Sequence, residues 1–108
     1  PSVAALKLLD QLVEAGSTIC YGGDFDPQGL EIGQRLAERY GASFQPWFFD
    51  TATYLQAPKG VNLAVEQSKK LAGQRVAWDD KLIETMLQVG KAVYQEVLVE
   101  RMIKYLFI

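Results

Sequence analysis

The stretch that decides the fold is Tyr21-Gly-Gly-Asp-Phe-Asp-Pro-Gln-Gly29. The run before it, residues 17–21, is β-branched and aromatic and lies between glycines, which predicts a buried strand. Asp26 is suited to cap a helix that has Pro27 at its first position, and apolar residues then recur at helical spacing up to Tyr40. The stretch therefore predicts a strand, a glycine-rich turn with two aspartates, and a helix.

Outward from this unit, helical and extended patterns alternate. Ser2 can cap a helix that stops at Gly16, and a second strand is expected over residues 42–49, with Pro46 at an edge or a bulge. The order helix, strand, helix, strand, helix predicts an α/β fold in which helices flank a parallel sheet. We expect residues 1–108 to form a single domain, or a truncated portion of one.

The second half of the chain is less regular. Asp50 or Thr51 can cap a short helix, and residues 63–71 form a possible helix within the ambiguous region 61–77, to which we assign no chemistry. From Asp79, apolar residues at helical spacing predict one long helix to the C-terminus.

Composition excludes several kinds of chemistry. The 108 residues include no His, which rules out His-based zinc sites, Ser-His triads and Cys-His dyads within this segment. Cys20 stands alone in an apolar run and is expected to be a buried small hydrophobic residue. The net charge of −2 lacks the basic character of a dedicated DNA-binding domain, so bound cations or another domain would have to offset phosphate repulsion.

The chain carries no targeting signal that we can identify. No apolar run approaches the roughly 20 residues that span a bilayer, and no signal peptide opens the chain. We therefore expect a cytoplasmic protein without a membrane partner. Because the chain lacks an initiator Met and starts inside an apparent helix, we expect it to be a piece of a longer protein.

Asp24 and Asp26 are the candidate metal ligands. Residues i and i+2 of an extended or turning backbone project to the same side, so two carboxylates can converge. Such oxygen ligands suit Mg²⁺ or Mn²⁺, and a divalent cation relieves the repulsion between them. Gly22 and Gly23 would leave room for a phosphate or a metal-bound water, next to the helix N-terminus that begins at Pro27.

Two other interpretations of these acids remain open. Asp24 can cap the turn and Asp26 the helix, with no metal bound. Asp50 ends the second predicted strand, on the same edge as Asp24 if the strands are parallel. It is either a third acidic group near the metal or a helix cap.

Several stretches resemble known families. Gly-Asp-Phe-Asp-Pro-Gln-Gly-Leu resembles the Asp-x-Asp-Pro-x-Gly motif of Toprim domains, especially those of the topoisomerase VI A subunit and its meiotic recombination relatives. Residues 1–10 and 21–32, and Pro46-Trp47 with Asp50 and Tyr54, resemble more closely a bacterial family with a Toprim-like C-terminal domain of unknown function. That family is similar to the nuclease subunit of the Wadjet anti-plasmid systems, which works with a condensin-like SMC complex.

The resemblance implies Mg²⁺-dependent cleavage of phosphodiesters, with Asp24 and Asp26 as catalytic, metal-binding residues and DNA as the substrate. It also implies a condensin-like SMC complex as a possible partner, and a homodimer is possible. The glutamate of the Toprim families lies on an earlier strand, which we expect upstream of residue 1. The fragment alone would then lack a complete site and would be inactive.

Two other functions compete with cleavage. A HAD-type phosphatase also has Asp-x-Asp after a strand, but that family has Thr or Val at the position of Gln28. It also has a later acidic pair at a strand end, for which only Asp79-Asp80 is available here. A non-catalytic DNA-binding or scaffold module would agree with the acidic balance and with the missing glutamate.

Overall fold

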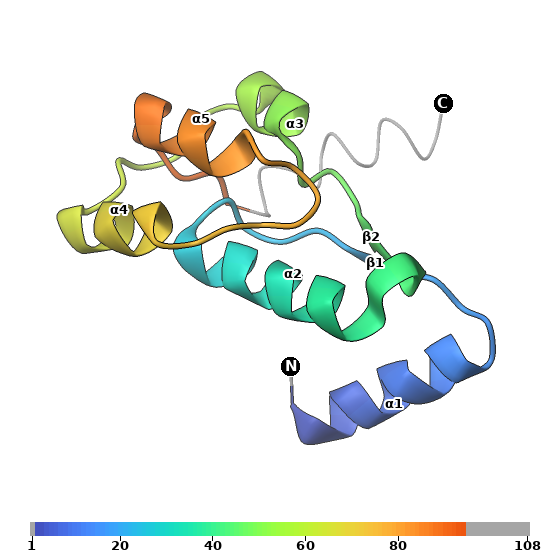
Figure 1. Cartoon of the computed structure of the whole chain (residues 1–108). Coiled ribbons are helices and arrows are strands. Elements are labelled where there is room, and N and C mark those ends of the chain that lie inside the picture. Colours follow the sequence, from blue (N-terminus) through green and yellow to red (C-terminus); the bar gives the residue numbers. More distant parts are fainter. Residues whose placement is uncertain (1, 95–108) are drawn as a thin grey trace.

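The computed structural model describes residues 2–94 and shows helices around a small parallel sheet (Figure 1). The elements in chain order are α1 (Val3–Glu14), β1 (Ile19–Tyr21), α2 (Pro27–Tyr40), the 3-10 turn η1 (Gly41–Ser43), β2 (Phe44–Pro46), α3 (Thr51–Gln56), α4 (Val65–Ala72) and α5 (Leu82–Val89). This arrangement confirms the expected mixed α/β class.

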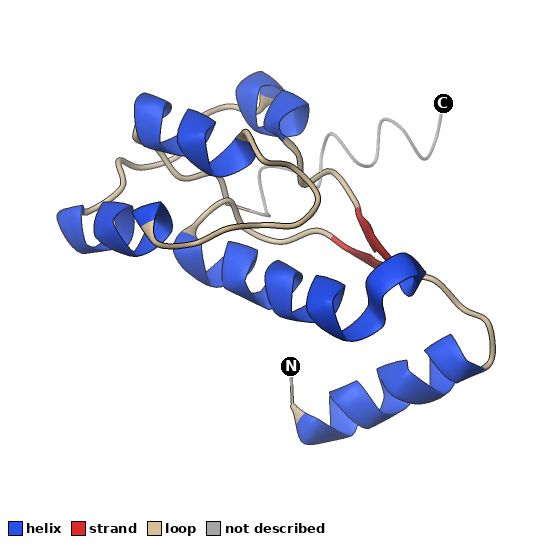
Figure 2. Cartoon of the chain, in the orientation of Figure 1, coloured by secondary structure: helices blue, strands red, loops and turns tan. Residues whose placement is uncertain are grey.

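The sheet consists of β1 and β2, which pair in parallel (red in Figure 2). Ile19 pairs with Phe44 and Tyr21 with Pro46, and the backbone N–H of Trp47 donates to the carbonyl oxygen of Tyr21 at 2.8 Å. Parallel neighbours need a crossover, and α2 supplies it. Both strands are shorter than predicted. In the second strand, η1 takes the first residues of the expected range.

The main core lies between α2, the sheet and the helices of the second half. Its fully buried large side chains include Phe25, Leu30, Phe49, Tyr54, Leu71, Leu82, Met86 and Val93. Trp78 stacks on Phe49, with ring centroids 5.4 Å apart, and its indole N–H donates to the Phe49 carbonyl oxygen at 2.6 Å. The segment before α5 is therefore fixed to the segment after β2.

The prediction of one long C-terminal helix was wrong over the part that the structure describes. Helix α5 ends at Val89, because Gly90 takes a left-handed conformation with φ +74° that breaks the helix. Beyond it, Lys91 and Val93 form antiparallel bridges with Asn62 and Phe25. The rest of the predicted helix, residues 95–108, lies outside the described residues.

The burial predicted for Cys20 was also wrong. Successive side chains of a strand point to opposite faces, and Ile19 is the one that packs under α1 and α2. Cys20 therefore points away from this cluster and is exposed.

The possible helix at residues 63–71 is confirmed as α4, where the Gln67 side chain accepts a hydrogen bond from the Ala64 N–H at 2.9 Å.

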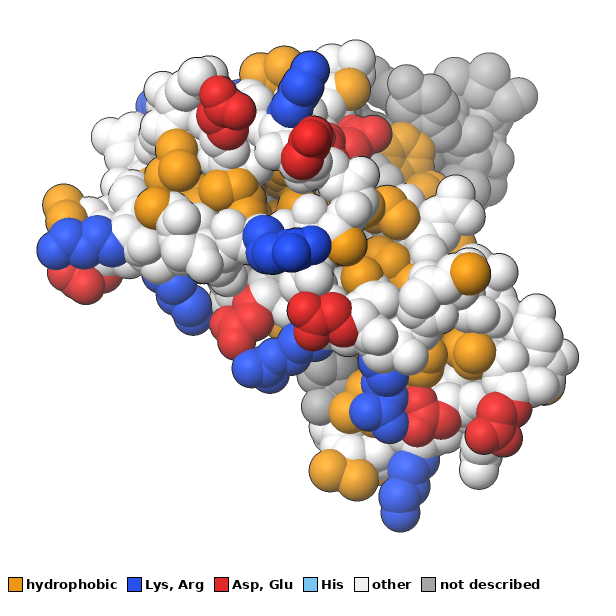
Figure 3. Space-filling model, in the orientation of Figure 1, with side chains coloured by type: hydrophobic (Ala, Val, Ile, Leu, Met, Phe, Trp, Pro, Cys, Tyr) orange, Lys and Arg blue, Asp and Glu red, His pale blue; other side chains and the backbone are white. Residues whose placement is uncertain are grey.

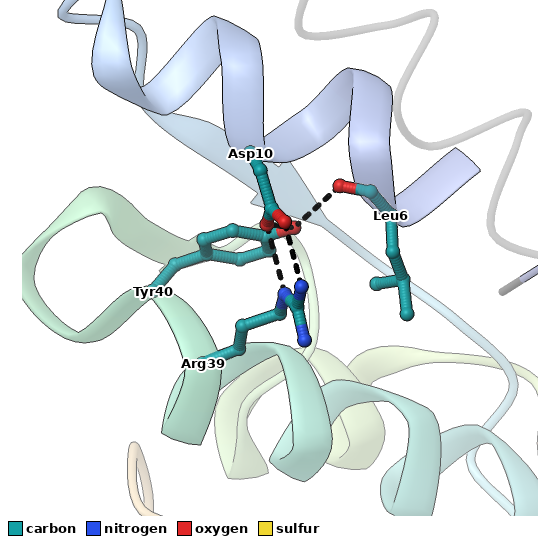
Figure 4. A network of polar contacts seen from close by, with 4 residues as sticks. All are labelled: Leu6, Asp10, Arg39 and Tyr40. Atoms are coloured by element: carbon teal, nitrogen blue, oxygen red, sulfur yellow. Dashed lines mark hydrogen bonds and ion pairs between the residues drawn. The ribbon is translucent and has the colours of Figure 1, made fainter. Parts of the chain in front are cut away.

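Helix α1 is fixed to α2 by a polar cluster (Figure 4). Arg39 donates from Nε and Nη2 to the two carboxylate oxygens of Asp10, at 2.8 and 2.6 Å. The Tyr40 hydroxyl donates to Asp10 Oδ1 at 2.8 Å and lies 3.5 Å from the Leu6 carbonyl oxygen. Hydrogen bonds from Arg39 and then from Tyr40 lower the pKa of Asp10 from 3.8 to about 2.

We predict that Asp10→Asn loosens α1, because the neutral amide loses the ion pair with Arg39. A carboxyl whose folded pKa is depressed stabilises the fold above its unfolded pKa, and this contribution is lost as the pH falls from about 3.8 through about 2. Amide exchange in α1 should be faster in the variant at neutral pH, and the two unfolding midpoints should converge in acid. Glu14→Gln, on the same helix, is the control; a pH-independent difference would contradict the assignment.

Candidate functional site

The acidic turn, residues 22–26, follows the carboxyl end of β1 and leads directly into α2. At its centre Phe25 is fully buried, and its backbone N–H donates to the Val93 carbonyl oxygen at 2.7 Å. The backbone stays extended at Asp26, with φ −147° and ψ 169°. Asp24 and Asp26 therefore project to the side opposite Phe25.

Asp26 caps α2, as the sequence predicts. Its Oδ1 accepts a hydrogen bond from the Gly29 N–H at 2.7 Å, and Pro27 occupies the start of the helix. Its Oδ2 accepts no hydrogen bond from any residue in the range 2–94. One carboxylate oxygen thus holds the helix end, and the other is available to a ligand. The cap and a metal-binding role are compatible.

The charges of both turn carboxylates act on the Tyr21 phenol. Partial burial raises the pKa of the Tyr21 phenol, and the charges of Asp24 and Asp26 raise it further. Our sequence interpretation missed Tyr21. Alternation along an extended backbone would place Tyr21 on the side of Phe25, so the sequence pattern gave no signal for it.

The glycines of the turn serve close packing. A Cβ at Gly23 would collide with the Tyr21 hydroxyl oxygen, and one at Gly29 would collide with the Asp24 carbonyl oxygen. The phenol therefore occupies the Cβ side of Gly23. The approach of a phosphate to Gly22 and Gly23 from another direction stays a prediction.

A shallow cavity of about 240 Å³ opens beside Asp26. It is lined from the α2 side by Asp26, Pro27 and Gln28 and from the α4 side by Glu66, Gln67 and Lys70. Lys70 also pairs with Glu31 at 3.3 Å. Space for a hydrated ion or an anionic group is therefore present next to Asp26, and α4 contributes a second carboxylate to its wall.

The other candidate acids have structural partners. Asp50 Oδ1 accepts from the Thr53 N–H at 2.8 Å, which confirms the cap on α3. Partial burial would raise the pKa of Asp79, but hydrogen bonds from the Thr51 hydroxyl, from the Thr51 N–H and from the Lys81 N–H lower it overall. Residues 2–94 contain no group of three or more acidic or Cys side chains placed to hold a metal, so Asp50 does not complete such a group with Asp24 and Asp26.

The turn offers two carboxylates to a metal ion, those of Asp24 and Asp26, with one residue between them. Two carboxylates fit Mg²⁺, which commonly keeps several waters and completes its coordination with substrate phosphate oxygens. The cavity at Asp26 supplies space for such waters. Within residues 2–94, the fit is therefore that of an open, water-rich site and not of a closed structural one.

The β1–α2–β2 unit with acids at the strand end defines an α/β domain with a candidate ligand site at its carboxyl edge. The chain belongs to the family described as "Protein of unknown function C-terminus (DUF2399)", which it matches over residues 1–106. No curated protein and no solved structure matches the chain. Among residues 2–94, no helix has the length and apolar character needed to cross a membrane.

We predict that Asp26→Ala lowers the free energy of unfolding by about 1 kcal/mol, through loss of the cap on α2. Asp26→Asn should retain most of this stability, because the amide oxygen can still accept from the Gly29 N–H. Urea unfolding without divalent ions measures both. An equal loss in the two variants would show that the charge, and not the cap, stabilises the turn.

We predict that Gly29→Ala destabilises the domain by about 1–3 kcal/mol, because the added Cβ forces the turn away from the helix. Gly73→Ala is the matched control, since its Cβ would meet only the Lys70 carbonyl oxygen, at an ordinary 3.7 Å. Urea unfolding of the two variants compares them. A Gly29→Ala protein as stable as the control would contradict the close contact with Asp24.

Proposed function

We propose that this domain supplies two metal-binding carboxylates to a Toprim-type, Mg²⁺-dependent DNA-cleaving protein. The observation that carries the proposal is the placement of Asp24 and Asp26 around the buried Phe25, where both act on the Tyr21 phenol. Their position at the carboxyl end of a parallel strand, directly before a helix N-terminus, supports it further.

In this proposal Asp24 and Asp26 hold Mg²⁺ or Mn²⁺. When bound, the ion would neutralise charge on the scissile phosphate and make a bound water more acidic. Asp26 keeps its Oδ1 on the Gly29 N–H, which fixes the orientation of its carboxylate, and the buried Phe25 fixes the backbone between the two ligands. The chain thus contributes a preorganised pair of charges.

The proposed substrate is DNA in the cytoplasm, in anti-plasmid defence. The net charge of −2 opposes binding to DNA by this domain alone, which supports a role for further protein surface. We propose that a condensin-like SMC complex, a second copy of the protein, or both, provide it.

A non-catalytic DNA-binding or scaffold module is the second candidate function. One observation favours it: residues 2–94 bring no third acidic side chain into a group with Asp24 and Asp26. A HAD-type phosphatase receives less support, because the Asp79 carboxylate is engaged by Thr51 and by the Lys81 backbone.

Calorimetric titration of Mg²⁺ into the full-length protein tests the proposal. We predict that Asp24→Asn and Asp26→Asn each weaken binding by about tenfold or more and abolish Mg²⁺-dependent DNA cleavage, since each removes a ligand charge. Asp50→Asn, which retains the cap on α3, should leave both unchanged. Mg²⁺ affinity that is the same in both variants as in the unchanged protein would contradict the metal site. An unchanged protein that binds Mg²⁺ but does not cleave DNA would favour the scaffold function.

A further inference from the structure

A second groove lies on the other side of α2 from α1, between α5 and the segment of residues 74–80. Its volume is about 480 Å³, which is within the range of ligand-binding pockets. Its apolar lining comes from Val76, Ala77, Ile83 and Leu87. Val76 is buried, whereas Leu87 is 37% exposed at the rim. Figure 3 shows hydrophobic side chains gathered over α5, with acidic and basic side chains beside them.

The rim of this groove is predominantly acidic. Asp79, Asp80 and Glu84 line it, against a single cation, Arg75. Lys81 lies between them in sequence but does not line the groove. The hydrogen bonds to Asp79 described above favour its ionised form, so its charge is held in place. The groove thus pairs an apolar floor with a negative edge.

The groove wall is fixed by long-range hydrogen bonds. The Ala77 N–H donates to Gln34 Oε1 at 2.7 Å, and Gln74 Nε2 donates to the Pro27 carbonyl oxygen at 2.9 Å. Gln74 Oε1 is a buried acceptor that finds no donor among the described residues. Because this oxygen is buried, it adds nothing to recognition at the groove surface, whereas the preformed wall lowers the ordering cost of binding.

We propose that this groove binds a cationic amphipathic segment of a partner protein. Apolar side chains of the segment would occupy the floor at Ile83 and Leu87, and its Lys or Arg side chains would face Asp80 and Glu84. Helices commonly bind in such a mode, with apolar anchors at helical spacing. The three carboxylates disfavour DNA, whose phosphates they would repel. This proposal stands on different residues from the metal site and does not depend on it.

A fluorescein-labelled 14-residue peptide of Leu and Lys at helical spacing is the probe, titrated with the whole chain in an anisotropy assay. The double variant Asp80→Lys/Glu84→Lys should weaken binding by about tenfold or more. The control Glu14→Lys/Glu66→Lys makes the same change in net charge at residues that do not line the groove, and it should change binding by less than about twofold. A Leu/Glu peptide of the same pattern should not bind. Circular dichroism confirms that each variant folds.

A third variant separates apolar from electrostatic recognition. Leu87→Ser, at the exposed rim, leaves the net charge unchanged and should weaken binding of the Leu/Lys peptide by a few-fold. Three results would overturn the proposal: no binding of the Leu/Lys peptide, equal weakening by the groove and control double variants, or a dimer in sedimentation that Asp80→Lys/Glu84→Lys dissociates. The last result would assign the groove to a second copy of the chain.

Discussion

The burial of Phe25 is the constraint on which the rest of the structure depends. Its ring contacts Phe49 and Tyr54 with centroids 5.0 and 5.4 Å away, and its backbone bridges to Val93. The turn after β1 is thereby attached to the segment after β2, to α3 and to the segment after α5. Because the core holds the central residue, its two acidic neighbours must lie outside the core.

Local signals made the first half of the fold predictable. Asp26 before Pro27 determines where α2 begins, and Asp50 determines where α3 begins, because each cap bonds to an N–H three residues ahead. The break at Gly90 was not predictable in the same way, since apolar residues continue at helical spacing through it and only tertiary packing brings Val93 beside Phe25. The exposure of Cys20 similarly depends on which strand face the helices cover.

Of the candidate site, the sequence predicted only the two aspartates. The alternation of Asp24 and Asp26 is visible in sequence, whereas the nearness of Tyr21 and of Glu66 depends on how the turn and α4 pack. The role of Lys59, outside this site, was likewise not visible in the sequence. Its ammonium donates to the carbonyl oxygens of Tyr54 and Ala57, both at 2.7 Å, and so stabilises the end of α3. Family membership carries no function here, so the site has to be argued from its chemistry.

Mn²⁺ titration followed by NMR tests the central claim most directly, because the paramagnetic ion broadens only the amide signals near it. If Asp24 and Asp26 form a divalent-ion site, the signals of residues 22–29 should broaden first, and Asp24→Asn should remove this selectivity. Broadening spread evenly over exposed carboxylates such as Glu14, Glu38 and Asp80, or confined to the groove beside α5, would contradict the account.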